Sequence, residues 1–541
     1  MTVVDQEQLV DAMILAARGE RAVVLVGAGI SMLAPSSLPS GNGLRDYVVE
    51  RLCRSRQTNE FWTALNADIR YSHLLPERSF QRLFEAVNEA LYCPLFEALS
   101  ALSPNSAHQV VGRLADAFVP ILTTNFDLLI ERCTDAPIIH LHGRLDSPDT
   151  MALRIEQVGM GLLPGLLRQC KRILKGKKLF ILGYSGRDRD VTDAISAAGP
   201  EEIWWADLCQ PAGAVKLKDS DVRFCCADLK EVMGAISYRL ENGKTGLVAS
   251  RPVSAAMPLR GLGLSYVESS DSDRFFCIVK LAAETGQFSL CAEACDAAVS
   301  CVARQQDMAA FASYAVLANR ELGRLGQAER WMDLGLKSVR YATAFLKAPV
   351  FNAYGTLQLD LKPPQVIKAL VAFRRALKYQ QRVCQKPPFR SNEPLVFLSR
   401  IYNNIGWAHH LGGDFERAIV AYEESLRLKR RAGDLPGVAF TSANLARVLY
   451  AAGQKQRASR WRVRARSRCR EFGLLGQEAS ILRDMAEVAF QDGRARRGSR
   501  WLDAAEELVC ETEWIVIWQS VRQARAKWTE AGSYIRSTVD R

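Results

Sequence analysis

The sequence of 541 residues lacks the features that mark several common classes of protein. It contains no run of about 18 uncharged apolar residues, which a membrane-spanning helix requires. Segment 1–20 is acidic and amphipathic and lacks the basic start of a signal peptide. No low-complexity tract occurs, and the 48% hydrophobic and 24% charged residues are typical of globular proteins. We therefore expect a cytoplasmic protein without membrane contact.

The sequence also lacks the usual ligand pattern of a metal site. It has 14 cysteines but no Cys-x-x-Cys pair, and structural zinc sites need paired ligands at short spacing. Cys225 and Cys226 are adjacent within an apolar run, and Cys291 and Cys295 lie one helical turn apart. These positions indicate small core residues in a reducing compartment. We expect no metal.

Residues 1–240 alternate short apolar runs with helical stretches. The predicted strands span 22–27, 118–124, 137–143, 178–183, 202–207 and 222–227. They are rich in β-branched and aromatic residues and are mostly continuous, which is typical of strands buried on both faces of a parallel sheet. Because helical segments follow most of them, the sequence predicts a doubly wound α/β domain. Ligands of such sheets bind beyond the carboxyl ends of the strands.

Residues 241–265 contain Gly, Pro and Ser without a clear period and are predicted to form a linker. Residues 266–541 are helical and repetitive. Glycines recur at Gly286, Gly323, Gly413, Gly453 and Gly493. Five residues after each comes Cys291, Ala328, Ala418, Ala458 or Gly498, and seven further Ala298, Gly335, Ser425, Ala465 or Ala505. A less regular sixth unit contains Ala369 and Ala376.

Small residues at these offsets let paired antiparallel helices approach closely, while the glycine terminates the first helix of each pair. The pattern resembles tetratricopeptide repeats. Six units predict an all-α helical solenoid with a concave face for a protein trigger. A generic helical bundle is the alternative.

A glycine-rich turn follows the first strand of the predicted sheet. The stretch "VVLVGAGIS" (23–31) places Gly27, Ala28, Gly29 and Ser31 directly after an apolar run. Glycines allow a tight turn and a close approach to a pyrophosphate. On its own the turn could equally serve packing. The sequence contains no Gly-x-x-x-x-Gly-Lys-Ser/Thr motif, so a phosphate loop of that type is excluded.

Further short segments follow in a fixed order. They are "SLPSG" (37–41), "PNSAH" (104–108), "TTNFD" (123–127), "LHG" (141–143) and "GYSGRD" (183–188). With the glycine-rich turn they resemble the sirtuin family, which binds NAD in a Rossmann-like domain, over roughly residues 20–230. The resemblance implies that NAD contacts Gly27, Ala28, Gly29, Ser31, Thr124, Gly183, Ser185 and Asp188. It also implies that Asn125 and Asp127 hold the nicotinamide ribose and carboxamide region, and that His142 is the base.

The implied chemistry suits these residue types. Cleavage of the nicotinamide–ribose bond develops positive charge on the sugar, as in glycoside hydrolysis. An Asn can orient a hydroxyl or water without carrying charge, and a neutral His can take a proton from it. Asp127 could instead brace its loop or a helix N-terminus. We interpret His140 and His108 as structural, and Asp207 as either a ribose contact or an exposed strand-end acid.

The sequence departs from protein-deacylating sirtuins in three places. The zinc module between Gly143 and Gly183 is absent, Thr124 replaces a Gln, and Arg45 matches the family arginine only across a gap. A cleft without a peptide groove would admit water and release nicotinamide and ADP-ribose. Zinc-less domains of this kind joined to sensor regions resemble bacterial anti-phage effectors that deplete NAD. That resemblance implies a restrained resting state, a homo-oligomer and activation through the repeats.

The net charge of +12 is concentrated in 455–470 and 494–500. Basic residues on nearly every second position would spread around a helix, which indicates solvated charge, and Trp331, Trp461 and Trp501 recur at positions typical of packing. Nucleic acid is possible but disfavoured, since no nucleic-acid fold accompanies the charge; we favour an acidic protein partner. Three functions stay open: a regulated NAD hydrolase, which we favour, an NAD-dependent deacylase or ADP-ribosyltransferase, and a non-catalytic scaffold sensing NAD or ADP-ribose.

Overall fold

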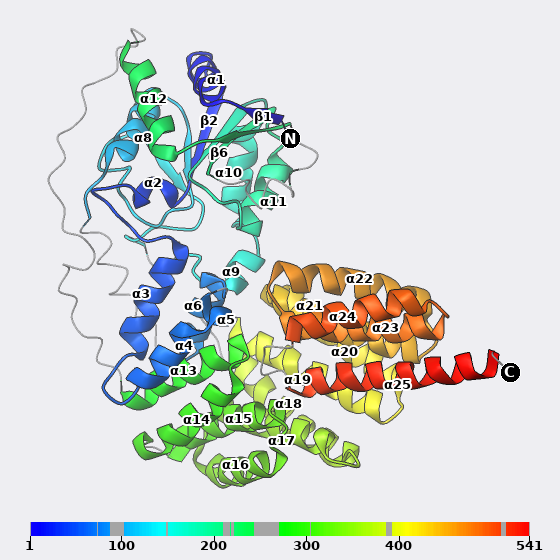
Figure 1. The fold of residues 1–541 in the computed structure, drawn as a ribbon. Helices are drawn as coiled ribbons and strands as arrows, with labels where there is room; N and C mark the ends of the chain where they lie inside the picture. The colour runs from blue at the N-terminus through cyan, green and yellow to red at the C-terminus, as the bar shows by residue number, and fades with distance from the viewer. Residues whose placement is uncertain are drawn as a thin grey trace. The chain divides into compact units, whose positions relative to one another are not determined.

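The structure is a computed structural model that describes residues 2–72, 74–86, 102–147, 150–208, 217, 221–242, 270–302, 305–385, 392–509 and 515–539. The chain divides into two compact units, Met1–Leu52 with Asn88–Glu268, and Cys53–Val87 with Ser269–Arg541 (Figure 1). Residues 53–87 therefore group with the helical repeats. The predicted linker at 241–265 lies outside the described residues except for 241–242, and the boundaries at 240 and 266 stay predictions.

The first unit contains a seven-stranded sheet in which every pairing is parallel. Its strands are β1 (Thr2–Val4), β2 (Ala22–Val26), β3 (Ile121–Thr123), β4 (Ile138–His140), β5 (Lys178–Leu182), β6 (Glu202–Asp207) and β7 (Val222–Cys226). The six strands predicted from the sequence are confirmed. The short edge strand β1, which pairs with β7, was not predicted.

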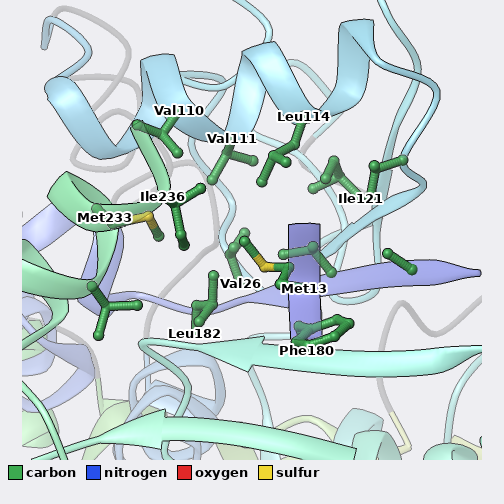
Figure 2. Close-up of a cluster of buried hydrophobic side chains, with 14 of the residues drawn as sticks. Met13, Val26, Val110, Val111, Leu114, Ile121, Phe180, Leu182, Met233 and Ile236 are labelled. Atoms are coloured by element: carbon green, nitrogen blue, oxygen red, sulfur yellow. The ribbon is translucent and has the colours of Figure 1, made fainter. Parts of the chain in front are cut away.

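Helices cover both faces of the sheet, which explains the continuous apolar strands. They are α1 (Gln6–Arg18), α8 (Ser106–Asp116), α10 (Pro164–Leu174), α11 (Arg189–Ala198) and α12 (Leu229–Asn242). Val24 and Val26 of β2 share a buried cluster with α1, α8 and α12 (Figure 2). Val23 and Leu25 face the opposite cluster, with α10 and α11. Alternate residues of one strand thus enter two cores.

The order of the strands locates the crevice of this fold. It runs β1-β7-β6-β5-β2-β3-β4. Read from β4 through β2 to β7, this is the doubly wound order in which the chain leaves β2 first to one side and later to the other. Dinucleotides bind such sheets at the carboxyl edge where the order reverses. Here the reversal lies between β2 and β5.

The second unit contains six helix pairs among its described residues, followed by one further helix. The bounds are α13 (Asp271–Thr285), α14 (Phe288–Ala298), α15 (Gln305–Glu321), α16 (Leu325–Ser338), α17 (Ala344–Asp360), α18 (Val366–Cys384), α19 (Glu393–Leu411), α20 (Phe415–Ala432), α21 (Leu435–Ala451), α22 (Lys455–Glu471), α23 (Leu475–Gln491), α24 (Ala495–Val509) and α25 (Ile515–Val539). The helices of each pair pack together, as do successive pairs. The predicted six units of tetratricopeptide-like repeats are confirmed.

The recurring glycines lie between the two helices of their pairs. Their φ angles are +75° at Gly286, +72° at Gly323, +78° at Gly413 and Gly453, and +74° at Gly493. This left-handed conformation favours glycine. The small residues at the predicted offsets are buried, because the paired helices approach closely. At Gly335 of α16, for example, a Cβ atom would lie 3.0 Å from the Cβ atom of Ala312 on α15.

Residues 53–87 add three helices to this unit, and nothing in their sequence predicted the association. The helices are α4 (Asn59–Ala67), α5 (Ile69–Ser72) and α6 (Pro76–Ala86). All three pack against α13, the first helix of the repeats. Phe61 of α4 meets Phe275 edge to face, with ring centroids 5.4 Å apart. The first helix pair is therefore covered by a segment that comes from much earlier in the chain.

The basic helix α22 distributes its charge as the sequence predicts. Lys455 and Arg464 are both exposed and lie on opposite sides of the helix, whereas Arg462 is buried with its guanidinium 4.9 Å from the Tyr450 ring centroid. The basic side chains therefore form no single face. Across the part of the chain that the structure describes, no helix is both long and apolar enough to cross a membrane.

Candidate functional site

The glycine-rich turn after β2 and the Gly183 turn after β5 touch at the reversal of strand order. The Gly29 N–H donates to the Gly183 carbonyl oxygen at 2.9 Å. A Cβ on Gly27 would lie 2.7 Å from that oxygen, and one on Gly29 would lie 2.8 Å from Gly183 Cα. Gly183 itself has φ +63°. All three glycines are required by the contact of the two turns, which brings the ends of β2 and β5 together.

The hydroxyl of Ser31, in the short helix α2 (Gly29–Met32), contacts three other side chains at this edge. It accepts from Asn125 Nδ2 at 3.0 Å and donates to Asp127 Oδ2 at 3.0 Å. It also lies 3.0 Å from Nε2 of His108. We call Ser31, His108, Asn125 and Asp127 the Ser31 cluster; all four residues are buried. Asn125 and Asp127 follow β3, whose carboxyl end lies beside that of β2.

The tautomer of His108 follows from its neighbours. Its Nδ1 accepts the backbone N–H of Asn105 at 3.1 Å, so the hydrogen of the neutral ring is on Nε2 and points to Ser31. Burial lowers the pKa of His108 to about 3, which keeps the ring neutral near pH 7. Asn105 caps α8 and also donates to the carbonyl oxygens of Ile30 and Leu33 at 2.7 and 2.9 Å. The α8 start thereby fixes the position of α2.

Asp127 makes the contacts of a bracing residue. Its Oδ1 accepts the Leu129 N–H at 3.1 Å, which closes the turn after β3, and its Oδ2 accepts the Ser31 hydroxyl. Burial raises the pKa of Asp127, although the bonds from Leu129 and Ser31 oppose that shift. Asp127 thus holds the loop and Ser31 together. The catalytic role assigned to it from the sequence stays a prediction.

The side-chain amide of Asn125 has a hydrogen-bond partner at its nitrogen but none at its oxygen among the described residues. Its Nδ2 donates to Ser31, and this assignment is fixed because the single Ser31 hydrogen goes to Asp127. Its Oδ1 is buried and has no hydrogen-bond partner among the described residues. A buried acceptor without a donor is unfavourable. A hydroxyl or water molecule that donates to Oδ1 would remove this cost.

The two histidines near the end of β4 have different partners. His140 Nδ1 lies 2.8 Å from the Asn125 carbonyl oxygen, and its Nε2 lies 2.6 Å from Glu131 Oε1. These contacts tie β4 to the loop after β3, a structural role. His142 Nε2 lies 3.1 Å from Asp190 Oδ2 and 3.2 Å from Asp190 Oδ1. Since a carboxylate accepts, the Nε2 hydrogen faces Asp190.

Asp190 is a site residue that sequence reasoning missed. It is buried in the first turn of α11, where its Oδ1 also accepts the N–H of Val191 at 2.9 Å. The only signal was an acid two residues beyond the "GYSGRD" segment. His108, interpreted from the sequence as structural, is a member of the Ser31 cluster.

The remaining predicted residues lie around the same edge of the sheet. The Thr124 N–H donates to the Val26 carbonyl oxygen at 3.2 Å. Ala28 and Ser185 are exposed. Asp188 precedes α11 without a side-chain cap bond. In the described residues, no group of three or more His, Cys, Asp or Glu side chains could hold a metal, and the expectation of no metal stays a prediction.

Other residues considered from the sequence are held locally. Arg45, in α3 (Gly41–Cys53), is buried and pairs with Asp46 at 2.8 Å. Asp207 Oδ1 accepts the N–H of Leu208 at 2.7 Å. These contacts belong to the local structure of α3 and of the β6 end.

Comparisons with known proteins agree with the two parts of the fold. The tetratricopeptide repeat family model matches residues 397–471, from within α19 to the end of α22. An NAD-dependent protein deacylase of Pseudomonas putida is 38% identical over 73 residues, which are 11% of this chain and 28% of the deacylase. The match therefore spans less than a third of that relative.

The solved structures that resemble parts of this chain are distant in sequence. A Rap protein complexed with Competence and Sporulation Factor is 12% identical, with 48% of this chain and 76% of that chain covered and a TM-score of 0.37. NprR in complex with its cognate peptide NprX is 12% identical, with 57% and 83% covered and a TM-score of 0.39. A signal transduction ATPase with a tetratricopeptide repeat sensor from Pyrococcus horikoshii is 15% identical, with 50% and 43% covered and a TM-score of 0.33.

Proposed function

For a chain that joins a parallel-sheet unit, similar in part to an NAD-dependent deacylase, to tetratricopeptide-like repeats, we propose the function of a regulated NAD⁺ hydrolase. Its substrate would be NAD⁺, cleaved at the nicotinamide–ribose bond to nicotinamide and ADP-ribose.

The observation that carries this proposal is the open Oδ1 of Asn125. The Ser31 cluster holds the amide in one orientation, so the buried oxygen is a fixed acceptor at the carboxyl edge of β3. A ribose hydroxyl or a water molecule would supply the missing hydrogen. Fixed acceptors of this kind orient a reacting group at no cost of rearrangement during the reaction.

His142 supplies the base. β3 and β4 are adjacent and parallel, and Thr123 pairs with His140, so Asn125 and His142 each follow a strand end at the same edge. Asp190 fixes the ring by accepting from Nε2. A histidine oriented in this way by a carboxylate can act as a general base.

The proposed reaction consumes one water. The bond between C1′ of the ribose and the nicotinamide nitrogen breaks, and its electron pair leaves with nicotinamide. A water oxygen forms the new bond to C1′, and His142 takes the proton that this water loses. The products are nicotinamide, ADP-ribose and one proton. Cyclised ADP-ribose would be a variant in which a second group of the substrate replaces water.

A protein deacylase is the second candidate, because the curated relative is named an NAD-dependent protein deacylase. In that case an acyl-lysine substrate, rather than water, would provide the attacking oxygen. The two functions differ in their requirements: a hydrolase consumes NAD⁺ alone, whereas a deacylase consumes it only with an acylated peptide.

The repeats would regulate the hydrolase. Uncontrolled loss of NAD⁺ would harm the cell that makes the enzyme, so the resting chain must be restrained and a protein trigger must release it. The resemblance to anti-phage effectors leads us to propose infection as the setting and a homo-oligomer as the working form.

Chromatography of nicotinamide and ADP-ribose after incubation with NAD⁺ tests the proposal. Because the resting chain is restrained, we expect both products from wild type in phage-challenged cells, where the trigger is present, without any added peptide, and none above background from His142→Ala. Loss of NAD⁺ only when an acyl-lysine peptide is present would replace the hydrolase with the deacylase. Binding of NAD⁺ without products under either condition, and also in phage-challenged cells, would contradict both.

A further inference from the structure

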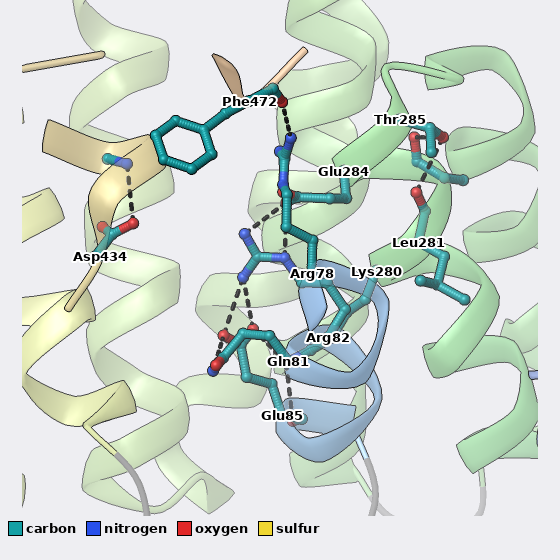
Figure 3. A network of polar contacts seen from close by, with 12 residues as sticks. Arg78, Gln81, Arg82, Glu85, Lys280, Leu281, Glu284, Thr285, Asp434 and Phe472 are labelled. Atoms are coloured by element: carbon teal, nitrogen blue, oxygen red, sulfur yellow. Dashed lines mark hydrogen bonds and ion pairs between the residues drawn. The ribbon is translucent and has the colours of Figure 1, made fainter. Parts of the chain in front are cut away.

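Helix α6 is docked onto the repeats by buried ion pairs (Figure 3). Glu284 of α13 accepts from Arg78 Nε at 2.8 Å and from Arg82 Nε at 2.7 Å. Arg82 Nη1 also pairs with Glu85 of its own helix at 2.8 Å, and the Lys280 ammonium of α13 donates to the Glu85 carbonyl oxygen at 2.8 Å. We call these five residues the α6 cluster.

The contact reaches beyond the first repeat. Arg78 Nη1 donates at 2.9 Å to the carbonyl oxygen of Phe472, which follows α22. One helix of 11 residues thus contacts both α13 and the turn between α22 and α23, about 190 residues apart in the chain. A helix with this position lies on a surface to which widely separated repeats contribute.

The electrostatics of the α6 cluster show how strongly each carboxylate depends on its partners. Burial would raise the pKa of Glu284, but the guanidiniums of Arg78 and Arg82 outweigh it and hold that pKa well below its usual value. Burial acts in the same sense on Glu85, yet Arg82 and Lys280 lower its pKa to about 2. Both carboxylates are therefore charged at neutral pH and need cationic partners.

The contacts of α6 show which charged groups a helix must present to bind this surface of the repeats. Glu284 pairs with two arginines one helical turn apart, and the Phe472 carbonyl oxygen accepts a further N–H from the first of them. The Lys280 ammonium lies 3.4 Å from the Glu85 carboxylate, in the next turn of α6. Arg78, Arg82 and Glu85 meet these demands with the spacing Arg-x-x-x-Arg-x-x-Glu. The spacing places all three side chains on one face of a helix.

We infer that this surface of the repeats is a binding site for a partner helix with two arginines one turn apart followed by a glutamate, and that α6 occupies it in cis. Charged side chains of the repeats, rather than an apolar groove, determine which helix can bind there. It comes from a segment outside the repeats, inserted between α3 and α8 of the first unit. α6 is also an imperfect occupant, since Gln81 Oε1 is buried without a hydrogen-bond partner in the described residues.

A labelled peptide of residues 74–86 tests the binding site on the full chain. In wild type the tethered α6 competes with the peptide at high effective concentration. The double variant Arg78→Ala/Arg82→Ala weakens the tethered helix, so we expect the peptide to bind it about tenfold or more tightly than wild type by fluorescence anisotropy. A peptide with both arginines replaced by alanine should bind neither protein.

Two control variants show whether a change in peptide binding comes from the α6 contacts. Arg320→Ala removes an ion pair between α15 and α17 and should bind the peptide as wild type does. Arg78→Lys keeps the charge but loses the forked contact, and it should give an intermediate affinity even if the double variant does not fold.

Three results would overturn the inference. They are no peptide binding to any variant, equal affinity for wild type and Arg78→Lys, or equal binding of the arginine-free peptide. Binding is read without NAD⁺. Tight peptide binding to a chain that never turns over NAD⁺ would instead contradict the proposed function and leave the helix site standing.

Discussion

The Ser31 cluster and the α6 cluster are both buried and polar, but they are built in opposite ways. In the first, an amide and a neutral imidazole donate to a serine hydroxyl, which in turn donates to one carboxylate. In the second, full charges face one another in short ion pairs. Neutral groups can be buried with one acceptor left open at modest cost, whereas buried charges must be paired. The first arrangement suits a site for chemistry, and the second suits docking.

The largest effect is expected at His142. Loss of a general base lowers a rate by about 10²- to 10⁴-fold, so we expect His142→Ala to lower kcat for NAD⁺ hydrolysis by that factor. Asp190→Asn should cause a smaller loss of kcat, because Asp190 orients the His142 ring but does not itself take the proton. His409→Ala, on α19 of the repeats, is the matched control. Equal rates for His142→Ala and the control would exclude His142 as the base.

The α6 cluster should respond most strongly in stability. Glu284→Ala leaves two buried guanidiniums without their shared carboxylate, which costs about 3–5 kcal/mol for a broken buried pair. Glu423→Ala removes a pair between exposed side chains, 3.5 Å from Arg457, and should cost less than about 1 kcal/mol. Denaturant unfolding measures both. Equal costs would mean that burial does not distinguish the α6 cluster from a surface pair.

The contribution of Ser31 to stability can be compared with that of Ser36, a buried serine outside the Ser31 cluster. Ser31→Ala removes the partner of Asn125 Nδ2, His108 Nε2 and Asp127 Oδ2 together. Ser36→Ala removes one bond, 2.8 Å long, to the Ser103 carbonyl oxygen. We expect the first substitution to cost about 1–3 kcal/mol more than the second, from the unsatisfied groups it leaves. If the two variants had the same unfolding midpoint, Ser31 would not stabilise the fold through its three side-chain partners.

A comparison of two glycines separates the stability that comes from the contact between the two turns from the cost of a positive φ angle. Gly183 and Gly199 both have positive φ, +63° and +59°, but only Gly183 has neighbours in the way of a Cβ. Gly199→Ala should cost about 1 kcal/mol from conformation alone. Gly183→Ala should cost about 1–3 kcal/mol more, because the new methyl group meets Leu229 at 2.8 Å. Thermal unfolding of the two variants, side by side, decides whether the contact matters.

The smallest effect concerns pH. Burial lowers the pKa of His108 to about 3 from an ordinary value of 6.5, so the unfolded chain binds a proton that the folded chain does not as pH falls below 6.5. Stability should therefore fall by about 1 kcal/mol between pH 7 and pH 5.5 on account of this residue. His108→Gln should lack that part of the pH dependence. A variant whose stability falls as steeply as wild type would contradict a neutral, buried His108.

The sequence predicted those features that are local or periodic. Six strands were found because each is a continuous apolar run, and the repeat glycines because each occupies the same left-handed turn. The edge strand β1 was missed because three residues carry no period. The docking of α6 and the pairing of His142 with Asp190 depend on contacts between distant segments. No local pattern records which carboxylate faces which base, or that Asn125 keeps one oxygen open.

The most direct test of the account measures Asn125→Ala twice, once for stability and once for NAD⁺ turnover. If Oδ1 serves the substrate, the substitution removes an atom that the folded chain itself leaves unpaired. We therefore expect little loss of unfolding free energy, within about 1–2 kcal/mol for the single Ser31 bond, together with at least about a hundredfold loss of turnover. Normal turnover in a destabilised variant would show that Asn125 serves the fold alone and would contradict the proposed site.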